Sequence, residues 1–269
     1  MSKGNQFKAH TQLKLSPFFE RTSKLNESQE WRRWSGYLAA TNYELTHENE
    51  YFAIRTKAAL LDITPLYKYI IEGPDAQLFL NRMVTRNIGI CNMGQVMYTP
   101  WCDEDGKQID DGTVQRLSDH KFRITSAEPN LEWIEYNAAG MDISILDDSY
   151  STAALAIQGP NSRTILNAVA NDSLNNLKFF WMMDTQFGDI PVSISRTGYT
   201  GDLGYEIWMD SEDALSVWDL LMDKGKFFGI TPTGLQALDM ARIEAGLILL
   251  DVDYISSRHA IVESRKSSP

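Results

Sequence analysis

The stretch AALAIQGPNSRTILNAV, residues 153–169, has the order of a strand, a Gly-Pro corner and a helix. Its first part is apolar, as in a buried strand, and proline suits a first helical turn because that turn leaves its N–H groups unbonded. The stretch LYKYIIEGPDAQLFLNRMV at 66–84 has the same order, and its Gly73 precedes Gly159 by 86 residues. The two stretches predict a pseudo-symmetric α+β fold, although convergence on a common corner explains them equally simply.

The remaining elements follow from the spacing of apolar residues and from breaker residues. Helices are expected at 48–60, 211–225 and 231–246, and further strands at 95–103, 112–119, 121–127, 189–198 and 205–210. Ser211 suits a helix start and Gly225 a helix end. The acidic, glycine-containing stretch 104–112 is expected to be a turn between two strands.

Composition limits the classes of function. The chain has 269 residues and a net charge of -11, and it is long enough to bury roughly 70 to 75% of its unfolded surface. An acidic chain without clustered Lys and Arg is not expected to bind nucleic acid, so a small metabolite is the better ligand. No apolar run is long enough to span a bilayer, which predicts no membrane partner.

Cysteine and histidine usage points to a cytoplasmic protein without a metal. Cys91 and Cys102 lie in unrelated contexts and there is no signal peptide, so reduced thiols are expected. The four histidines do not occur at metal-ligand spacing, and we predict no transition-metal site. They are His10, His47, His120 and His259.

The glycine-rich stretch SRTGYTGDLGYEIW, residues 195–208, is the first candidate site. It is not a dinucleotide-binding fingerprint, because a strand follows it where that fingerprint needs a helix. A flat ligand can lie against its three glycines with Tyr199 over one face. Strand alternation puts Glu206 and Trp208 on one face, where the carboxylate can accept two N–H bonds from an amidine-like edge. The alternative is a glycine-rich hairpin with an exposed acid.

The second candidate site is the pair Asp110 and Asp111. The two aspartates open a strand, so one of them must face inward, where an unpaired carboxylate costs several kcal/mol. A binding or catalytic role explains that cost, and an Asx-turn before Gly112 is the alternative. Further along, Arg242 either pairs with Asp239 on a helix surface or points into the cleft of Glu206 to clamp a carbonyl or carboxylate.

Together these stretches resemble the folate-binding module of the glycine cleavage T-protein (aminomethyltransferase) and its tetrahydrofolate-dependent demethylase relatives. The matching pieces, in the family's order, are AIRTKAALLDI, GPDA, DEDGKQIDDG, AIQGP, SRTGYTGDLGYEI and ALDMARIEAG. The resemblance implies an α+β module of two interleaved subdomains over residues 1–264. Residues 265–269 form a tail where the family's C-terminal β-barrel domain would begin.

The resemblance also implies residue roles and a cofactor. The cofactor is tetrahydrofolate, with Glu206 on the amino-pyrimidine edge of the pterin and Tyr199, Arg242 and Tyr98 lining the pocket. The family's catalytic aspartate beside folate N5 aligns to Asp110, with Asp111 as the competing choice. The reaction implied is transfer of a methyl or aminomethyl group to N5.

Departures from the family pattern concern the one-carbon donor. Residues 62–68 read DITPLYK where the family has Asp-Val-Ser-His-Met-Gly, and Gly106-Lys107 replaces a double glycine. A sulfonium, amine or aryl-ether donor is therefore expected in place of lipoyl-bound aminomethyl. A wall of aromatic rings can bind such a cation, with core packing as the alternative role. The rings are those of Trp31, Trp34, Tyr37 and Trp101.

The sequence is compatible with three functions: an enzyme of the demethylase type, the T-protein proper, and a catalytically silent folate-binding member. Because family members continue into a domain that closes the folate cavity, another chain or that missing domain is expected to close it here.

Overall fold

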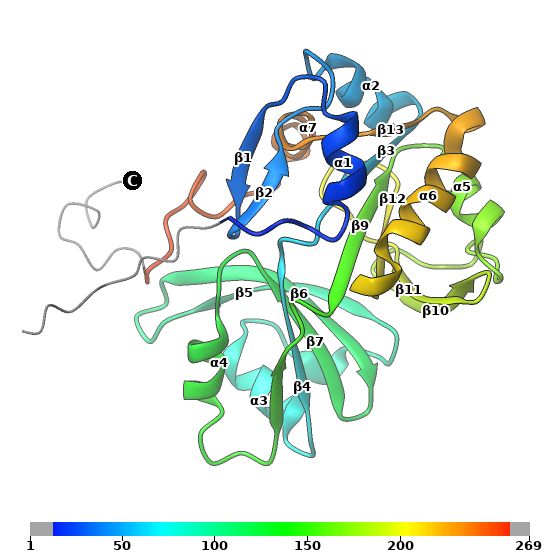
Figure 1. Cartoon of the computed structure of the whole chain (residues 1–269). Helices are drawn as coiled ribbons and strands as arrows, with labels where there is room; N and C mark the ends of the chain where they lie inside the picture. Colours follow the sequence, from blue (N-terminus) through cyan, green and yellow to red (C-terminus); the bar gives the residue numbers. More distant parts are fainter. Residues whose placement is uncertain (1–12, 259–269) are drawn as a thin grey trace, which may run out of the picture.

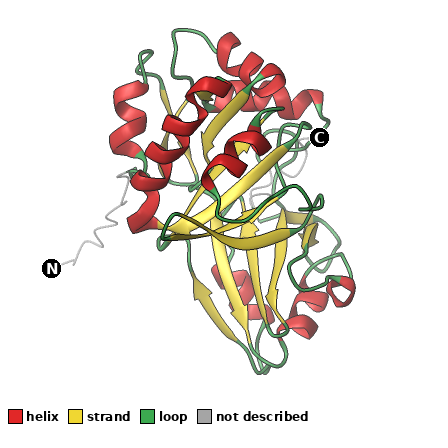
Figure 2. Cartoon of the chain, turned by 90° about the vertical axis from the view of Figure 1, so that its right-hand side faces the viewer, coloured by secondary structure: helices red, strands yellow, loops and turns green. Residues whose placement is uncertain are grey.

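A computed structural model describes residues 13–258, which form two bodies, each built on its own β-sheet. Figure 1 shows the two bodies one above the other, and Figure 2 shows their strands meeting near the middle of the molecule. The chain enters the upper body, crosses to the lower one and returns, so the two bodies are interleaved in sequence. The expected boundary after residue 264 lies outside the described residues.

The lower body is a five-stranded antiparallel sheet in the order β5-β6-β7-β4-β8 with two helices. Its elements are β4 (Tyr67–Glu72), α3 (Ala76–Met83), β5 (Val96–Cys102), β6 (Gln108–Ser118), β7 (Lys121–Ser126), α4 (Leu131–Asn137) and β8 (Ser144–Asp147). Phe79 and Leu80 of α3 are fully buried in a core with Trp101 and Phe122 of the sheet, which explains the apolar stripe of that helix.

The upper body is a six-stranded mixed sheet in the order β10-β11-β12-β9-β3-β13, with helices on both faces and a small hairpin. The hairpin and first helices are α1 (Phe19–Leu25), β1 (Trp31–Trp34), β2 (Tyr37–Ala40) and α2 (Glu48–Thr56). The sheet and its other helices are β3 (Ala58–Asp62), β9 (Thr152–Gln158), α5 (Ser162–Val169), β10 (Met182–Phe187), β11 (Ile190–Ser195), β12 (Gly204–Asp210), α6 (Ala214–Gly225), β13 (Ile230–Pro232) and α7 (Leu235–Glu244).

The strand order confirms the predicted pseudo-symmetry. In the lower sheet β5-β6-β7-β4 are neighbours, and in the upper sheet β10-β11-β12-β9 repeat that order from the equivalent points of the chain. The two units also bond to one another at equivalent positions. Val96 N–H donates to Phe180 O at 2.8 Å, and Met182 N–H donates to Gly94 O at 2.8 Å. Each residue of one bond lies 86 positions from its counterpart in the other.

The Gly-Pro corners are equivalent in detail. Gly73 and Gly159 both have left-handed backbones, with φ of +147° and +119°, which a side chain rarely adopts. In the helix after each corner, an asparagine side chain accepts a hydrogen bond from the backbone N–H seven residues later. Asn81 Oδ1 accepts from Ile88 N at 2.6 Å, and Asn167 Oδ1 accepts from Leu174 N at 2.8 Å. The Leu-Asn echo in the sequence therefore has a shared structural cause.

The predicted helix at 48–60 is wrong in its last four residues. Helix α2 ends at Thr56, and Ala58–Asp62 forms strand β3 between β9 and β13. The first four residues of β3 are buried, so the apolar run has no polar side to distinguish a strand from a helix. This correction places Asp62 at a strand end in the upper sheet.

Helix α6 also begins and ends differently from the prediction. The carboxylate that accepts at its entrance belongs to Asp210, which bonds Glu212 N at 2.8 Å. Gly225 lies inside the last turn, and the left-handed residue after it is Gly229, with φ of +72°. The helix predicted at 231–246 is wrong at its start, because Ile230–Pro232 forms strand β13 and α7 begins at Leu235. Elements without a strong periodic signal were not expected from the sequence: α1, β1, β2, α4, β8 and β10.

Candidate functional site

Asp110 lies inside β6 and is completely buried. Its carboxylate accepts from Asp111 N at 2.7 Å, Glu128 N at 3.0 Å and Asn130 Nδ2 at 2.7 Å. Burial raises the pKa of Asp110 to about 7, although these three donors lower it. Because both aspartates are strand residues, the Asx-turn alternative is wrong. Asp110 anchors the loop after β7 to β6.

Asp111 faces the other side of β6 and is partly exposed. The phenol of Tyr254 donates to Asp111 Oδ1, and Gln108 Nε2 lies 3.4 Å from the same oxygen. Burial raises the pKa of Asp111, while the phenols of Tyr254 and Tyr98 lower it. Burial, together with the Asp111 charge, raises the pKa of Tyr98. Two tyrosines from different segments therefore contact one carboxylate.

Tyr199 of the glycine-rich loop lies near this carboxylate. Burial raises the pKa of Tyr199, the charge of Asp111 raises it further, and the guanidinium of Arg242 lowers it. Its phenol donates to the carbonyl of Ile248. The structure thus brings Tyr98 and Tyr199 near Asp111 and Arg242 near Tyr199, whereas no contact joins Glu206 to this group among the described residues.

Arg242 forms the expected i, i+3 ion pair with Asp239, but it is 2% exposed, so this pair does not lie on the helix surface. Its Nη1 donates to Leu247 O at 3.1 Å and to the carboxylate of Asp253, whereas Nε lies 3.7 Å from Asp239 Oδ1. Arg242 therefore joins α7 to the segment that follows it.

Glu206 lies in β12, on the upper sheet. The predicted alternation is confirmed, because Tyr205 and Ile207 enter the core beneath α5 and α6 whereas Trp208 packs under α7. Thr197 Oγ1 donates to Glu206 Oε2 at 2.7 Å. Burial raises the pKa of Glu206, and the hydroxyls of Thr197 and Ser195 lower it.

No described Lys, Arg or His forms an ion pair with Glu206. A largely buried carboxylate without a cation is costly unless N–H or O–H donors meet it. Glu206 is partly exposed, so its carboxylate can also accept from the N–H groups of a ligand.

Two glycines of the loop are required by packing within the protein. A Cβ at Gly198 or at Gly204 would collide with the side chain of Gln158, and only Gly201 of the three has a positive φ, +77°. Gln158 Oε1 in turn accepts from Thr200 Oγ1 at 2.9 Å. The expectation that a flat ligand lies against all three glycines is corrected, because two of them make room for this buried amide.

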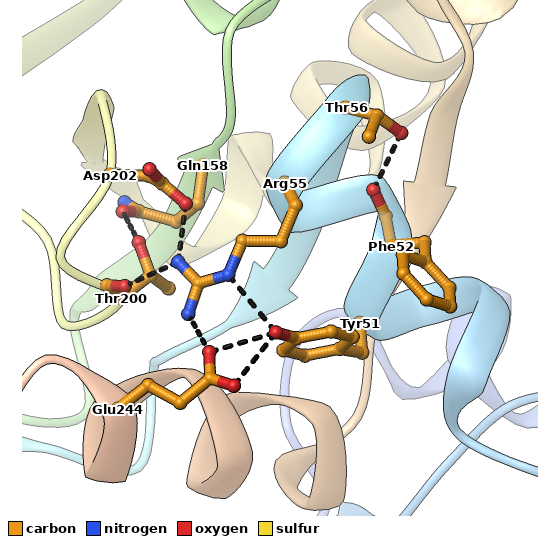
Figure 3. A network of polar contacts seen from close by, with 8 residues as sticks. All are labelled: Tyr51, Phe52, Arg55, Thr56, Gln158, Thr200, Asp202 and Glu244. Carbon is orange, nitrogen blue, oxygen red and sulfur yellow. Dashed lines mark hydrogen bonds and ion pairs between the residues drawn. The ribbon is translucent and has the colours of Figure 1, made fainter.

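Arg55 of α2 is a site-positioning residue that the sequence analysis missed. Figure 3 shows its guanidinium between the loop and α7, where it donates to Thr200 O at 3.0 Å and pairs with Asp202 and Glu244. The Tyr51 phenol donates to Glu244 at 2.8 Å and, with Arg55, lowers the pKa of that carboxyl. The only signal in the sequence is one arginine within the apolar stripe of a short helix.

The predicted wall of four aromatic rings does not form. Trp101 is 1% exposed in the core of the lower body, whereas Trp31 and Trp34 lie on the hairpin of the upper body. Trp31 and Trp34 instead line a small cavity beside Asp62 in the upper body. This cavity has room for about one water molecule, so it does not suit an organic cation.

Across residues 13–258, no three His, Cys, Asp or Glu side chains gather as a set of metal ligands. His10 and His259 lie outside this range. Cys91 and Cys102 are both free thiols. None of the described helices is long and apolar enough to cross a membrane.

Comparison with known proteins adds to this geometry. Residues 18–263 match the family model described as the GCVT N-terminal domain. An aminomethyltransferase of Halothermothrix orenii is 35% identical over 93% of this chain and 70% of its own length. A heme-dependent oxidative N-demethylase gamma subunit of Ectopseudomonas mendocina is 36% identical over 82% of this chain and 58% of its own length. A trimethylamine-oxide aldolase of Ruegeria pomeroyi is 41% identical over 76% of this chain and 27% of its own length.

A solved structure agrees in fold. The glycine cleavage system aminomethyltransferase T of Bartonella henselae superimposes with a TM-score of 0.79 and 26% identity, over 89% of this chain and 64% of that chain. The chain therefore spans only part of the length of the proteins that it resembles.

Proposed function

Since the chain belongs to the family of the GCVT N-terminal domain, we propose that it transfers a one-carbon group, methyl or aminomethyl, from a small donor to N5 of tetrahydrofolate. The observation that carries this proposal is the carboxylate of Glu206 on β12, which has hydroxyl donors but no cation partner among the described residues. The amino-pyrimidine edge of a pterin offers two parallel N–H donors, which is the partner that such a carboxylate lacks.

The residues of the site fit tetrahydrofolate. Glu206 would hold the amino-pyrimidine edge, Tyr199 would cover a ring face, and Tyr98 and Arg242 would line the remaining wall. When bound, tetrahydrofolate supplies N5 as the nucleophile. The loop that carries Tyr199 is held in place by Arg55, so this wall is formed before a ligand arrives.

We assign the role beside N5 to Asp111 in preference to Asp110, the residue to which the sequence resemblance aligns. Asp110 is fully buried and already receives three N–H donors, whereas Asp111 is partly exposed on the side of Tyr199. Asp111 would accept the proton that N5 loses as the new N5–carbon bond forms. The bond from that carbon to the donor nitrogen or sulfur breaks at the same time, and its electron pair leaves with the donor.

A donor that carries its carbon on nitrogen is favoured. Two of the relatives have names that describe chemistry of N-methyl groups, an N-demethylase subunit and a trimethylamine-oxide aldolase. Residues 62–68 also lack the family's histidine. A glycine cleavage T-protein and a silent folate-binding protein are the alternatives. We further propose a cytoplasmic location and closure of the pocket by a partner subunit or an additional domain.

Calorimetry and a turnover assay separate these functions. Saturable binding of tetrahydrofolate by the folded chain under anaerobic conditions is expected, together with methyl transfer from methylated ammonium donors. Binding without turnover on amine, sulfonium, aryl-ether or lipoyl donors would instead support the catalytically silent folate-binding protein. A folded chain that does not bind tetrahydrofolate would refute the proposal.

A further inference from the structure

The segment 247–258 connects the two bodies across the proposed site. It leaves α7 with a bond from Leu247 N–H to Arg242 O at 2.9 Å and reaches β6, where Ser257 N–H donates to Gln108 O at 2.9 Å. Figure 1 shows it, in orange to red, descending from α7 toward the ends of β5 and β6. The segment therefore reaches the beginning of the strand that carries both aspartates.

Side chains of this segment reach both aspartates. The Tyr254 phenol donates to Asp111 Oδ1. Arg258 Nη1 donates to Asn130 Oδ1 at 3.2 Å, and Asn130 Nδ2 in turn donates to Asp110 at 2.7 Å. One short stretch of chain thus holds the partly exposed carboxylate directly and the buried one through an amide.

Apart from its contact with Asp111, Tyr254 contributes little to the packing of the protein. Its neighbours Val252 and Ile255 are 66% and 39% exposed, and Tyr254 itself is only partly buried, so the ring adds little to a core. What distinguishes it is the contact of its hydroxyl with Asp111. Burial and the Asp111 charge raise the pKa of Tyr254, which keeps the phenol a donor.

We propose that Tyr254 is a positioning residue for one-carbon transfer, with its phenol fixing the orientation of the Asp111 carboxylate from the segment that follows α7. The inference rests on the function proposed above. Holding Oδ1 fixes the direction of Oδ2, the oxygen that we assign to N5. The phenol reaches Asp111 only when segment 247–258 lies against β6. The position of that segment and the orientation of the Asp111 carboxylate are therefore coupled.

The ionisation of Asp111 is the property that Tyr254 controls. The titratable groups that face Asp111 are Tyr98 from β5, Tyr199 from the loop and Tyr254 from the segment, and Asp110 lies next to it on the opposite side of β6. A hydroxyl that donates to a carboxylate stabilises its charged form and lowers its pKa. Removing the Tyr254 hydroxyl must therefore raise the pKa of Asp111.

The test is Tyr254→Phe in the full chain, compared with Tyr136→Phe, whose ring is 76% exposed. Carboxyl ¹³C NMR follows the Asp111 signal, assigned by its absence in Asp111→Asn, across a pH titration. Its midpoint is expected to move to higher pH in Tyr254→Phe and not in Tyr136→Phe. Transfer should fall about tenfold at low pH and recover at high pH, with KM for tetrahydrofolate unchanged.

Two further results decide the matter. Replacing Tyr254 with 3-fluorotyrosine, a stronger donor of nearly the same shape, should move the midpoint to lower pH even if Tyr254→Phe does not fold. Midpoints that stay in place in both variants would overturn the role of Tyr254. If the wild-type chain binds no tetrahydrofolate, the proposed function fails, and the NMR midpoints still report whether Tyr254 acts on Asp111.

Discussion

Glu206→Gln tests the proposed pterin contact most directly. The carboxylate of Glu206 offers two acceptor oxygens to an amino-pyrimidine edge, and Thr197 Oγ1 donates to Oε2 at 2.7 Å. Glutamine keeps the shape but replaces one oxygen with an NH₂ group, which cannot accept from a second donor. The variant therefore changes the chemistry of the contact without opening a cavity.

The size of the effect follows from which way the new amide turns. Thr197 and Ser195 hydroxyls lie 2.7 Å apart, and either can be the donor, so the pair can reverse and accept from the amide. In that orientation one charge-assisted bond is lost, about 2 kcal/mol. In the other orientation two N–H groups confront one another, and the loss rises to about 5 kcal/mol. The expected rise in Kd is from about 30-fold to several thousand-fold.

Anaerobic calorimetry with tetrahydrofolate measures this change, with circular dichroism to verify folding. Glu72→Gln is the matched control, because Glu72 lies at the exposed end of β4 and pairs with Lys121 at 3.0 Å. An unchanged Kd in folded Glu206→Gln would refute the assignment of the pterin edge to this residue. A Kd that rises equally in both variants would point to a general effect of charge.

Three other variants test the remaining roles. Asp111→Asn should slow transfer by about 10²–10⁴-fold with little change in tetrahydrofolate affinity, and the reverse pattern, with Asp110→Asn slow and Asp111→Asn normal, would restore Asp110 beside N5. The pKa of Asp110 is raised to about 7 from 3.8, so its protonated form stabilises the fold below about pH 4 and that stability is lost as the pH rises through 7. Urea unfolding at pH 5 and pH 8 should show a smaller loss for Asp110→Asn than for wild type, and equal losses would exclude Asp110 as the source. Arg55→Met should lower the free energy of unfolding by about 1 kcal/mol and weaken tetrahydrofolate binding, because the glycine-rich loop loses its tie to α7. Arg21→Met, which breaks an exposed pair with Asp219, should leave binding unchanged, and a similar loss in both would contradict the role of Arg55.

Much of the fold and part of the site could be predicted because they depend on local chemistry. Proline after glycine favours a corner between a strand and a helix, so Gly73 and Gly159 indicate two similar units, which the strand order then confirms. Side chains alternate along a strand, which is why the opposite faces of Glu206 and Tyr205 follow from their order. The same alternation requires that one of the two adjacent aspartates be buried.

Tertiary structure decided what local chemistry leaves open. The sequence by itself determined that one aspartate is inward, but only the loop after β7, through Asn130, shows that it is Asp110. The sequence contains an apolar run at 58–61, but this run is a strand only because it pairs with β9 on one side and β13 on the other. The glycines of the loop serve Gln158, and the carboxylate of Asp111 meets Tyr254, because residues distant in sequence become neighbours when the two bodies come together. Contacts of that kind leave no periodic trace in the chain, since periodicity records only which face of an element is apolar.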